Sequence, residues 1–220
     1  KLKGKDCVWF WIDGFGAEYT PLFLHELKAR GIVPESVKLA TALLPTETEY
    51  NHQWDEHDPL TIKWDRLDSF SHEGMPDDKS YYSCIAHQLS VFYDAAKKVE
   101  ELLESHEYVV VTSDHGSSRF AALAFHEKSV VALTPPKRST VHSFGRFCEL
   151  GDKTEDVISL PCTVPVTSNG TRYLVMDNYQ HFSVSGNAAG GNTDEHDVVG
   201  EIHGGNTAEE RLVSVVVIKR

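Results

Sequence analysis

The sequence predicts an α/β fold: a doubly wound, mostly parallel central sheet with helices on both faces. Residues 7–12 and 108–113 are continuous apolar runs rich in β-branched and aromatic side chains, which is typical of strands buried on both faces. A helical pattern follows the first run and another precedes the second, so strands and helices alternate. Both runs end in a turn that carries an aspartate and a glycine. Because ligands of open α/β sheets gather at the carboxyl ends of strands, we expect the functional site at these turns.

The first strand opens a strand–turn–helix unit. Asp13 begins the turn, and a helix is expected over residues 19–30, with Pro21 in its first turn and Gly31 at its end. Residues 37–44 form a second apolar run and predict another strand.

A long polar region follows. Residues 45–52, with the sequence Pro-Thr-Glu-Thr-Glu-Tyr-Asn-His, leave the second strand, and residues 53–78 show no sustained period. The absence of a period predicts a loop or insertion. Asp68 and His72 lie within this predicted loop.

Residues 78–106 give the clearest helical pattern in the chain. Apolar side chains recur at steps of three and four and form one continuous stripe: Tyr82, Ile85, Leu89, Phe92, Ala96, Val99 and Leu103. We expect the helix to pack this stripe on the sheet and to lead into the strand at 108–113.

The second half of the chain predicts mostly short strands, at residues 119–125, 130–133, 163–166, 171–176 and 181–184. Residues 186–200 are rich in glycine and predict a loop. A helix is expected to start at Thr207, because Thr207 and Glu210 have the spacing of a capping box. The last apolar run, 212–218, predicts a final strand.

Composition narrows the class of protein. The length of 220 residues suits one domain, 1–220, and the missing initiator methionine leads us to expect a catalytic domain taken from a longer protein. The formal net charge of −12 argues against a basic face for nucleic acid, which would need a basic partner or neighbouring domain. No apolar run reaches the roughly 20 residues of a membrane span. Four cysteines without a Cys-x-x-Cys pair are typical of reduced thiols in a cytoplasmic protein.

Metal-ligand side chains recur beside strand ends and turn glycines. The set comprises six strong ligands and one hydroxyl: Asp13, Asp68, His72, Asp114, His115, His203 and Thr48. Two divalent metals about 3.5–4 Å apart need roughly three protein ligands each and an open position for substrate. The set meets this requirement. Mixed imidazole and carboxylate ligands favour Zn²⁺, with Mn²⁺ as the alternative.

Five of these segments, in this order, resemble the alkaline phosphatase superfamily: Asp13-Gly, residues 45–52, Asp68-x-x-x-His72, Ser113-Asp-His-Gly116 and His203-Gly. Within the superfamily, Pro-Thr-x-Thr-x-x-Asn-His resembles the nucleophile loop of nucleotide pyrophosphatases/phosphodiesterases. The stretch from His203 to Val216 resembles the end of PglZ domains, which occur in BREX phage-defence systems.

The resemblance implies the role of each ligand. One metal would be held by Asp13, Asp114 and His115, with the Thr48 hydroxyl bound to it. The second would be held by Asp68, His72 and His203. Thr48 would be the nucleophile, because it aligns with the second threonine of the family loop, and Thr46 is the alternative. Metal coordination would lower the pKa of the Thr48 hydroxyl. Asn51 would donate a hydrogen bond to a non-bridging phosphate oxygen.

The implied function is that of a two-metal phosphodiesterase with a phosphodiester or nucleotide substrate, acting with other BREX components. Two alternatives stay open. Glu47 and Glu49 flank Thr48 and would repel a phosphate if they turned inward, which would suit a metal-binding assembly module with weak catalysis. The other alternative is a phosphomonoesterase or phosphotransferase of the same superfamily. No lysine or arginine lies within the motifs. The cations elsewhere in the chain that could serve a monoester, Lys137, Arg138 and Arg146, are interpreted as solvated surface residues.

Overall fold

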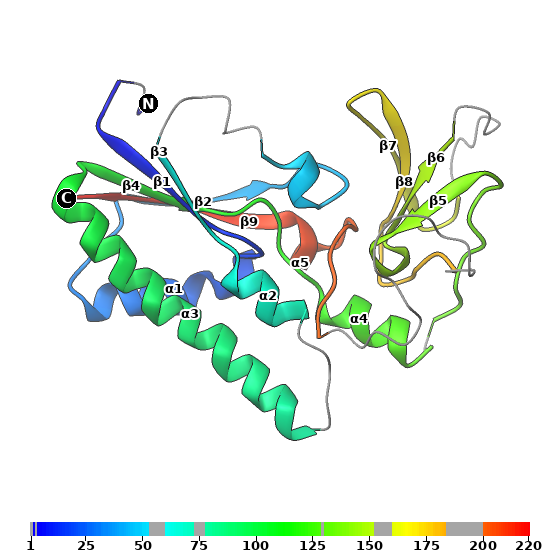
Figure 1. The fold of residues 1–220 in the computed structure, drawn as a ribbon, viewed down its shortest axis with the longest axis horizontal. Coiled ribbons are helices and arrows are strands. Elements are labelled where there is room, and N and C mark those ends of the chain that lie inside the picture. Colours follow the sequence, from blue (N-terminus) through cyan, green and yellow to red (C-terminus); the bar gives the residue numbers. More distant parts are fainter. Residues whose placement is uncertain are drawn as a thin grey trace.

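The structure, a computed structural model, describes residues 2, 4–52, 60–72, 78–128, 130–151, 160–183 and 200–220. These residues form two separate β-sheets, one of five strands and one of four. Figure 1 shows the five-stranded large sheet with the long helices on one side of the molecule and the four-stranded small sheet beside it. The prediction of a mixed α/β architecture around a central sheet is therefore met.

The large sheet has mixed strand directions. Its order is β2 (Ser36–Thr41), β9 (Leu212–Lys219), β4 (Tyr108–Thr112), β1 (Cys7–Ile12) and β3 (Leu60–Trp64). β1 pairs in parallel with β3 and β4, whereas β9 pairs antiparallel with β2 and β4. The expected mostly parallel sheet is thus only partly right. The antiparallel direction of β9 follows from the position of α5 (Ala208–Arg211), which directly precedes it. α5 lies at the edge of the sheet where β4 ends, so β9 starts at that edge and runs opposite to β4.

Helices cover one face of the large sheet. α1 (Thr20–Ala29), α2 (Arg66–His72) and α3 (Asp78–Ser105) share a hydrophobic core with alternate residues of β1, β4 and β9. Figure 1 shows α1 and α3 together below this sheet. The predicted helices at 19–30 and 78–106 are confirmed, but in the described residues the helices that pack on this sheet do not lie on both faces.

The chain leaves the large sheet after β4. Residues 119–126 form the helix α4 (Arg119–His126) and not the predicted strand. Ser118 caps the helix by accepting a hydrogen bond from the Ala121 backbone N–H, and three buried alanines favour helix over strand. Phe125 of α4 contacts Phe144, so α4 packs on the small-sheet side.

The segment predicted as a loop between residues 53 and 78 contains regular structure. β3 lies at the edge of the large sheet, and α2 follows it after a single residue, Asp65. Residues 53–59 and 73–77 lie outside the described residues. β3 follows an alternating apolar pattern over only five residues, which is why the surrounding polar sequence hid it.

The small sheet is antiparallel, with the order β5 (Ser139–His142), β6 (Phe147–Leu150), β8 (Thr171–Met176) and β7 (Thr163–Ser168). The strands predicted at 163–166 and 171–176 are confirmed. The strands predicted at 130–133 and 181–184 are wrong for the described residues, which form only an isolated β-bridge there, between Leu133 and Phe182. The predicted glycine-rich loop, 186–200, falls outside them except for Gly200.

The described helices also bear on membrane insertion. Across the described residues, each helix is either too short or too polar to cross a lipid bilayer.

Candidate metal centre and nucleophile loop

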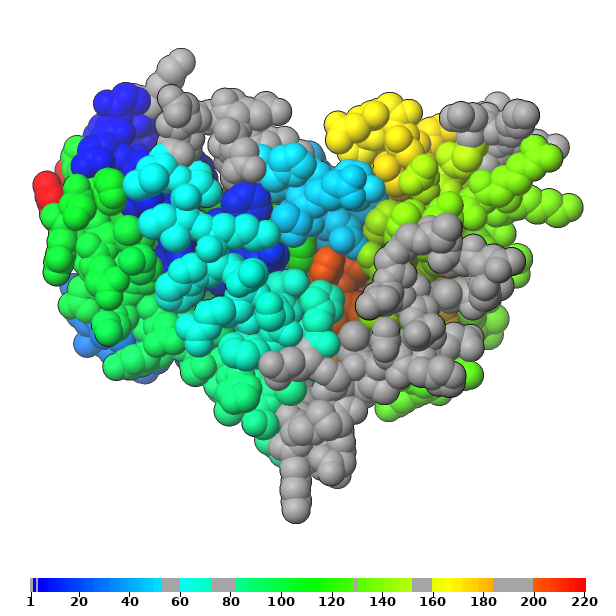
Figure 2. Space-filling model, in the orientation of Figure 1, coloured from blue at the N-terminus to red at the C-terminus, as the bar shows by residue number. Residues whose placement is uncertain are grey.

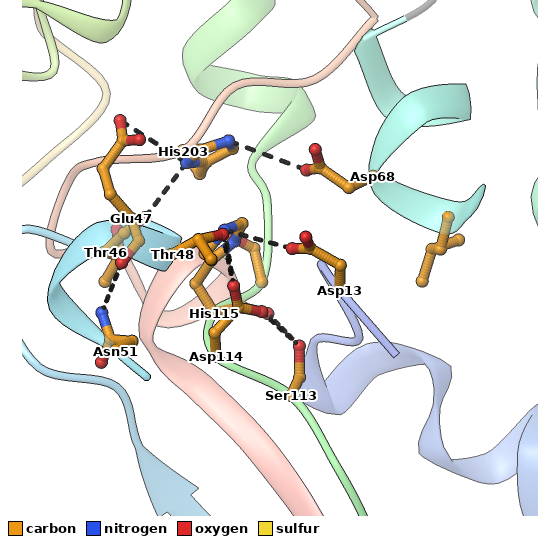
Figure 3. Close-up of polar contacts among 12 residues, drawn as sticks. Asp13, Thr46, Glu47, Thr48, Asn51, Asp68, Ser113, Asp114, His115 and His203 are labelled. Carbon is orange, nitrogen blue, oxygen red and sulfur yellow. Dashed lines mark hydrogen bonds and ion pairs between the residues drawn. The ribbon is translucent and has the colours of Figure 1, made fainter. Parts of the chain in front are cut away.

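The site begins where β1 and β4 end side by side. Their parallel register pairs Trp11 with Thr112, so the residues that follow each strand emerge at the same edge. Asp13 follows β1, and Ser113, Asp114 and His115 follow β4. All are buried, and Figure 3 shows them converging with side chains from three other segments.

Asp13, Asp114 and His115 form one group of possible metal ligands. The His115 Nε2 atom lies 3.5 Å from Asp13 Oδ1 and 3.4 Å from Asp114 Oδ2. Asp114 is held in place through its other oxygen, which accepts hydrogen bonds from the Trp11 indole at 3.2 Å and from the Ser113 hydroxyl at 3.1 Å. The group is therefore rigidly positioned by its neighbours.

Asp68 and His72 approach from α2. Because they are four residues apart on a helix, both side chains lie on the same face, and Asp68 Oδ1 is 3.4 Å from His72 Nε2. His203 meets them from the segment before α5: its Nε2 lies 3.1 Å from His72 Nε2 and 3.7 Å from Asp68 Oδ1. The His203 ring also stacks on His115, with ring centroids 4.0 Å apart. The two ligand groups are thus in direct contact.

The nucleophile loop, residues 45–52, brings Thr48 to the junction of these groups. The Thr48 hydroxyl donates a hydrogen bond to Asp114 Oδ2 at 2.6 Å and lies 3.4 Å from His115 Nε2. In Figure 2 the light-blue surface of residues 41–50 lies beside the orange surface of the 200–206 segment and the cyan surface around α2. Thr48 is partly exposed, in contrast to Asp114 and His115 beside it, which are buried.

Thr46 and Asn51 hold the backbone of the site. Thr46 is fully buried, and its hydroxyl donates to Gly205 O at 2.8 Å and accepts from the Gly204 N–H at 3.0 Å. The Asn51 amide accepts from the Leu43 N–H at 2.6 Å and its nitrogen approaches three carbonyls, at Leu43, Pro45 and Glu47. In this structure both side chains make hydrogen bonds to the backbone and so shape the loop.

The close packing of buried carboxylates and histidines shifts the pKa values of the site. Burial, with the charges of Asp114 and Asp68, raises the pKa of Asp13 to about 7. Burial also opposes ionisation of Asp68, but the contacts with His72 and His203 outweigh it and hold the pKa of Asp68 below its ordinary value. For His203, burial lowers the pKa, whereas Glu47 and the three aspartates raise it to about 9 as the net result. The cluster therefore attracts cations strongly.

Two oxygens provide a test of whether metals fit. Asp13 Oδ1 and Asp68 Oδ1 are buried and make no hydrogen bond among the described residues, although buried carboxylates normally have partners. One lies in each ligand group, and each points toward the histidine nitrogens of its group. Three aspartates and three histidines with two unsatisfied oxygens have the chemistry of a divalent-metal site.

Several residues of the site escaped the sequence analysis. Lys63 of β3 lies with its ammonium 2.7 Å from Asp13 Oδ2, because β3 runs beside β1 and pairs Lys63 with Trp11. The alternation of Leu60-Thr-Ile-Lys-Trp was the available signal. Arg146, interpreted from sequence as a solvated cation, is fully buried and forms a bidentate ion pair with Glu210 at 2.8 Å. Lys137 and Arg138 are exposed, as expected.

Comparison with known proteins supports the fold. The sequence matches no family model and no curated protein sequence. Among solved structures, murine ectonucleotide pyrophosphatase/phosphodiesterase 5 is similar, with a TM-score of 0.57 and 13% identity over 96% of this chain and 88% of the other. An inactive threonine-to-alanine variant of that protein in complex with AMP aligns with the same TM-score. Phosphonoacetate hydrolase from Sinorhizobium meliloti, in complex with phosphonoformate, gives 0.51 and 12% over 97% and 89%. The fold of this chain is therefore similar to that of these proteins.

Proposed function

We propose that this chain is a two-metal phosphodiesterase in which Thr48 is the nucleophile. The observation that carries the proposal is the position of the Thr48 hydroxyl, 2.6 Å from Asp114 Oδ2 and 3.4 Å from His115 Nε2. Among the residues of the loop that carry a hydroxyl, Thr48 is partly exposed, whereas Thr46 and Tyr50 are buried.

The ligand groups support a two-metal assignment. Asp13, Asp114 and His115 would hold one cation together with Thr48, and Asp68, His72 and His203 would hold the other. When bound, two cations, proposed as Zn²⁺, would supply positive charge that acidifies the threonine hydroxyl and stabilises the negative charge of a phosphoryl transition state.

The side chains of the chain itself orient the reacting hydroxyl. Asp114 accepts the hydrogen bond of Thr48, and the pKa of Asp114 is below its ordinary value because His115 and the hydrogen bonds from Thr48 and Trp11 outweigh its burial. Asp114 is thus an ionised acceptor that fixes the direction of the hydroxyl. Asn51 holds the loop backbone, so that Thr48 is presented at one position.

The charge around the site favours a diester substrate. A monoester carries one more negative charge than a diester, and its binding normally calls for an extra cation. Lys63 is already paired with Asp13, and Arg146 is buried against Glu210. A nucleotide-like substrate is further supported by the similarity to a phosphodiesterase solved in complex with AMP.

The biological setting proposed here is phage defence, as the catalytic domain of a PglZ protein of a BREX system in the cytoplasm. The support is the resemblance of the stretch from His203 to Val216 to the end of PglZ domains. At a net charge of −12, binding of nucleic acid would require a basic partner or domain.

The test combines metal content with activity. Elemental analysis is expected to find about two zinc equivalents, and bis-p-nitrophenyl phosphate should be hydrolysed faster than p-nitrophenyl phosphate. Thr48→Ala should abolish turnover while keeping the metals, and Thr48→Ser should retain part of it. A preference for the monoester would indicate a phosphomonoesterase. Two bound metals without any turnover would indicate the assembly module, and equal turnover by Thr48→Ala would remove Thr48 as the nucleophile.

A further inference from the structure

Glu47 and Glu49 flank Thr48 but face different surroundings. The Glu49 side chain is exposed, whereas Glu47 is partly buried and turned inward. The Ser143 hydroxyl, which comes from the 3-10 turn η4 (Ser143–Gly145) of the small sheet, donates a hydrogen bond to Glu47 Oε1. The same carboxylate oxygen lies 3.7 Å from the Nδ1 atom of His203. Glu47 therefore connects the small sheet to a candidate metal ligand.

The backbone at Ser143 is held in an unfavourable conformation. Ser143 and Phe144 both have positive φ angles, 48° and 53°, and Gly145 follows at 81°. Among the described residues, these are the only two successive non-glycine residues in the left-handed region, which side chains other than glycine rarely adopt. Such strain persists only where surrounding contacts hold it, and it is concentrated at functional positions.

The strained turn also packs against the segment that carries His203. Gly204 has a φ of +108°, and a Cβ atom at Gly204 would lie 3.1 Å from Ser143 Cβ and 3.0 Å from a ring carbon of Phe147. Ser143 thus contacts both the residue that follows His203 and the carboxylate that faces the His203 ring.

The His203 ring is oriented from its Nδ1 side. Nδ1 lies 3.1 Å from the Thr46 carbonyl oxygen and 3.7 Å from the Glu47 carboxylate, so two acceptors face it. Nε2, on the other side of the ring, points to His72 and Asp68, as Figure 3 shows for Asp68. Metal-binding histidines commonly have their second nitrogen fixed by a carboxylate or a carbonyl, which sets the tautomer and makes the ligand more basic.

We propose that Glu47, held by Ser143, is a positioning residue for His203, and that the small sheet is in this way part of the metal site. The inference rests on the proposed two-metal function. It also assigns a role to the charge beside Thr48: the Glu47 carboxylate faces Nδ1 of His203, whereas Asp68 faces Nε2 of the same ring.

The test uses Zn²⁺ titration calorimetry. Glu47→Gln is expected to weaken one of the two Zn²⁺ sites about 10–100-fold, the range typical of partners of metal-binding histidines. Ser143→Ala should weaken the same site by a smaller factor, and the double variant should be no weaker than Glu47→Gln alone, because both act through one contact. Glu49→Gln removes the same charge two residues away at an exposed position and should leave both sites unchanged.

A double variant tests whether Glu47 acts through His203. Asp68→Asn should lose the Zn²⁺ site that contains His203, so adding Glu47→Gln to it should leave the Zn²⁺ affinity of the other site unchanged. Equal weakening by Glu47→Gln and Glu49→Gln, or an effect of Glu47→Gln on the Zn²⁺ left in Asp68→Asn, would overturn the inference.

The outcomes separate this inference from the proposed function. Two tight Zn²⁺ sites that Glu47→Gln leaves unchanged would refute the positioning role and keep the function. Two Zn²⁺ sites that respond as expected, in a protein without hydrolytic activity, would refute the function alone. Absence of Zn²⁺ binding by the wild type would refute both. If Glu47→Gln does not fold, Glu47→Asp and Ser143→Ala provide the same comparison against Glu49→Asp.

Discussion

The ammonium of Lys63 lies 2.7 Å from Oδ2 of Asp13, which leaves the other carboxylate oxygen, Oδ1, facing His115 Nε2 at 3.5 Å. One oxygen of Asp13 is thus neutralised from the strand beside it, and the other is directed into the candidate metal group. Lys63 has this position because β3 runs parallel to β1, with Lys63 opposite Trp11.

We therefore expect Lys63→Met to weaken the Zn²⁺ site that contains Asp13 by about 10–100-fold, as for other groups that orient metal ligands. Loss of the ammonium would also remove the contact that lowers the pKa of Asp13, so the variant should need a higher pH to bind Zn²⁺. Lys63→Arg keeps the charge and should retain most of the affinity. Calorimetry provides the measurement, and Lys98→Met, which breaks an ion pair with Glu101 on α3, is the matched control. A Lys63→Met protein with unchanged Zn²⁺ affinity would contradict this prediction.

The pH dependence of stability should change sign with metal. In the metal-free protein the pKa of His203 is raised from 6.5 to about 9, so its contribution to stability is present below pH 6.5 and is lost as the pH rises toward 9. Asp13, raised from 3.8 to about 7, loses its contribution over a lower range in the same direction. Zn²⁺ binds deprotonated ligands, so its stabilisation grows with pH.

Scanning calorimetry in EDTA should therefore give a Tm that falls between pH 6.5 and about 9, and a slight excess of Zn²⁺ should remove or reverse this fall. His203→Gln is the control, because it should flatten the profile in EDTA. A Tm that rises with pH in EDTA would show that the charges of the cluster do not act on His203 as described.

The sequence was informative where patterns were long or positions were fixed by strand ends. The strands at 7–12 and 108–112 follow from apolar and β-branched runs, and the helix over 78–105 follows from the apolar stripe between Tyr82 and Leu103. Asp13, Asp114 and His115 follow those strands directly, so their proximity could be inferred from the parallel pairing of β1 and β4.

Short elements and distant pairings could not be inferred in this way. In the small sheet, β7 and β8 were predicted, but β5 and β6 have only four residues each and carry no distinctive period. Glu47 meets Ser143 across 96 residues of sequence and Arg146 meets Glu210 across 64, and a single sequence gives no signal for either pair. Asp68 and His72 were expected on a loop, where their spacing has no geometric meaning; on α2 the same spacing places them together.

The buried pair of Arg146 and Glu210 should be essential to the segment that carries His203. Glu210 also accepts hydrogen bonds from the Gly205 N–H at 2.9 Å and from the Thr207 hydroxyl at 2.8 Å, and neither charged side chain is exposed. Arg146→Met should lower the free energy of unfolding by about 3–5 kcal/mol, because it leaves a buried carboxylate without its cation. Urea denaturation measures this loss.

The double variant Arg146→Met with Glu210→Leu should be more stable than Arg146→Met alone, since no unpaired charge remains. Arg138→Met, at an exposed arginine, should stay within about 0.5 kcal/mol of the wild type. If Arg146→Met were as stable as Arg138→Met, the buried pair would not be what holds the two segments together.

Gly116, which follows His115 directly, allows the closest approach between the end of β4 and the segment of α5. Its N–H donates to the Glu210 carbonyl at 3.0 Å, and a Cβ atom would lie 2.1 Å from the Glu209 carbonyl oxygen and 2.9 Å from Gly16 Cα. All of these neighbours are backbone, so they cannot rotate away. Gly116→Ala should therefore cost about 1–3 kcal/mol or more and displace His115, with weaker Zn²⁺ binding. Gly170→Ala is the control: its φ is +81° but no heavy atom lies within 4 Å of the added Cβ, so only strain of about 1–2 kcal/mol is expected, with Zn²⁺ binding unchanged. Urea denaturation and Zn²⁺ titration of both variants provide the measurements. If Gly116→Ala bound Zn²⁺ as tightly as Gly170→Ala, this account would be contradicted.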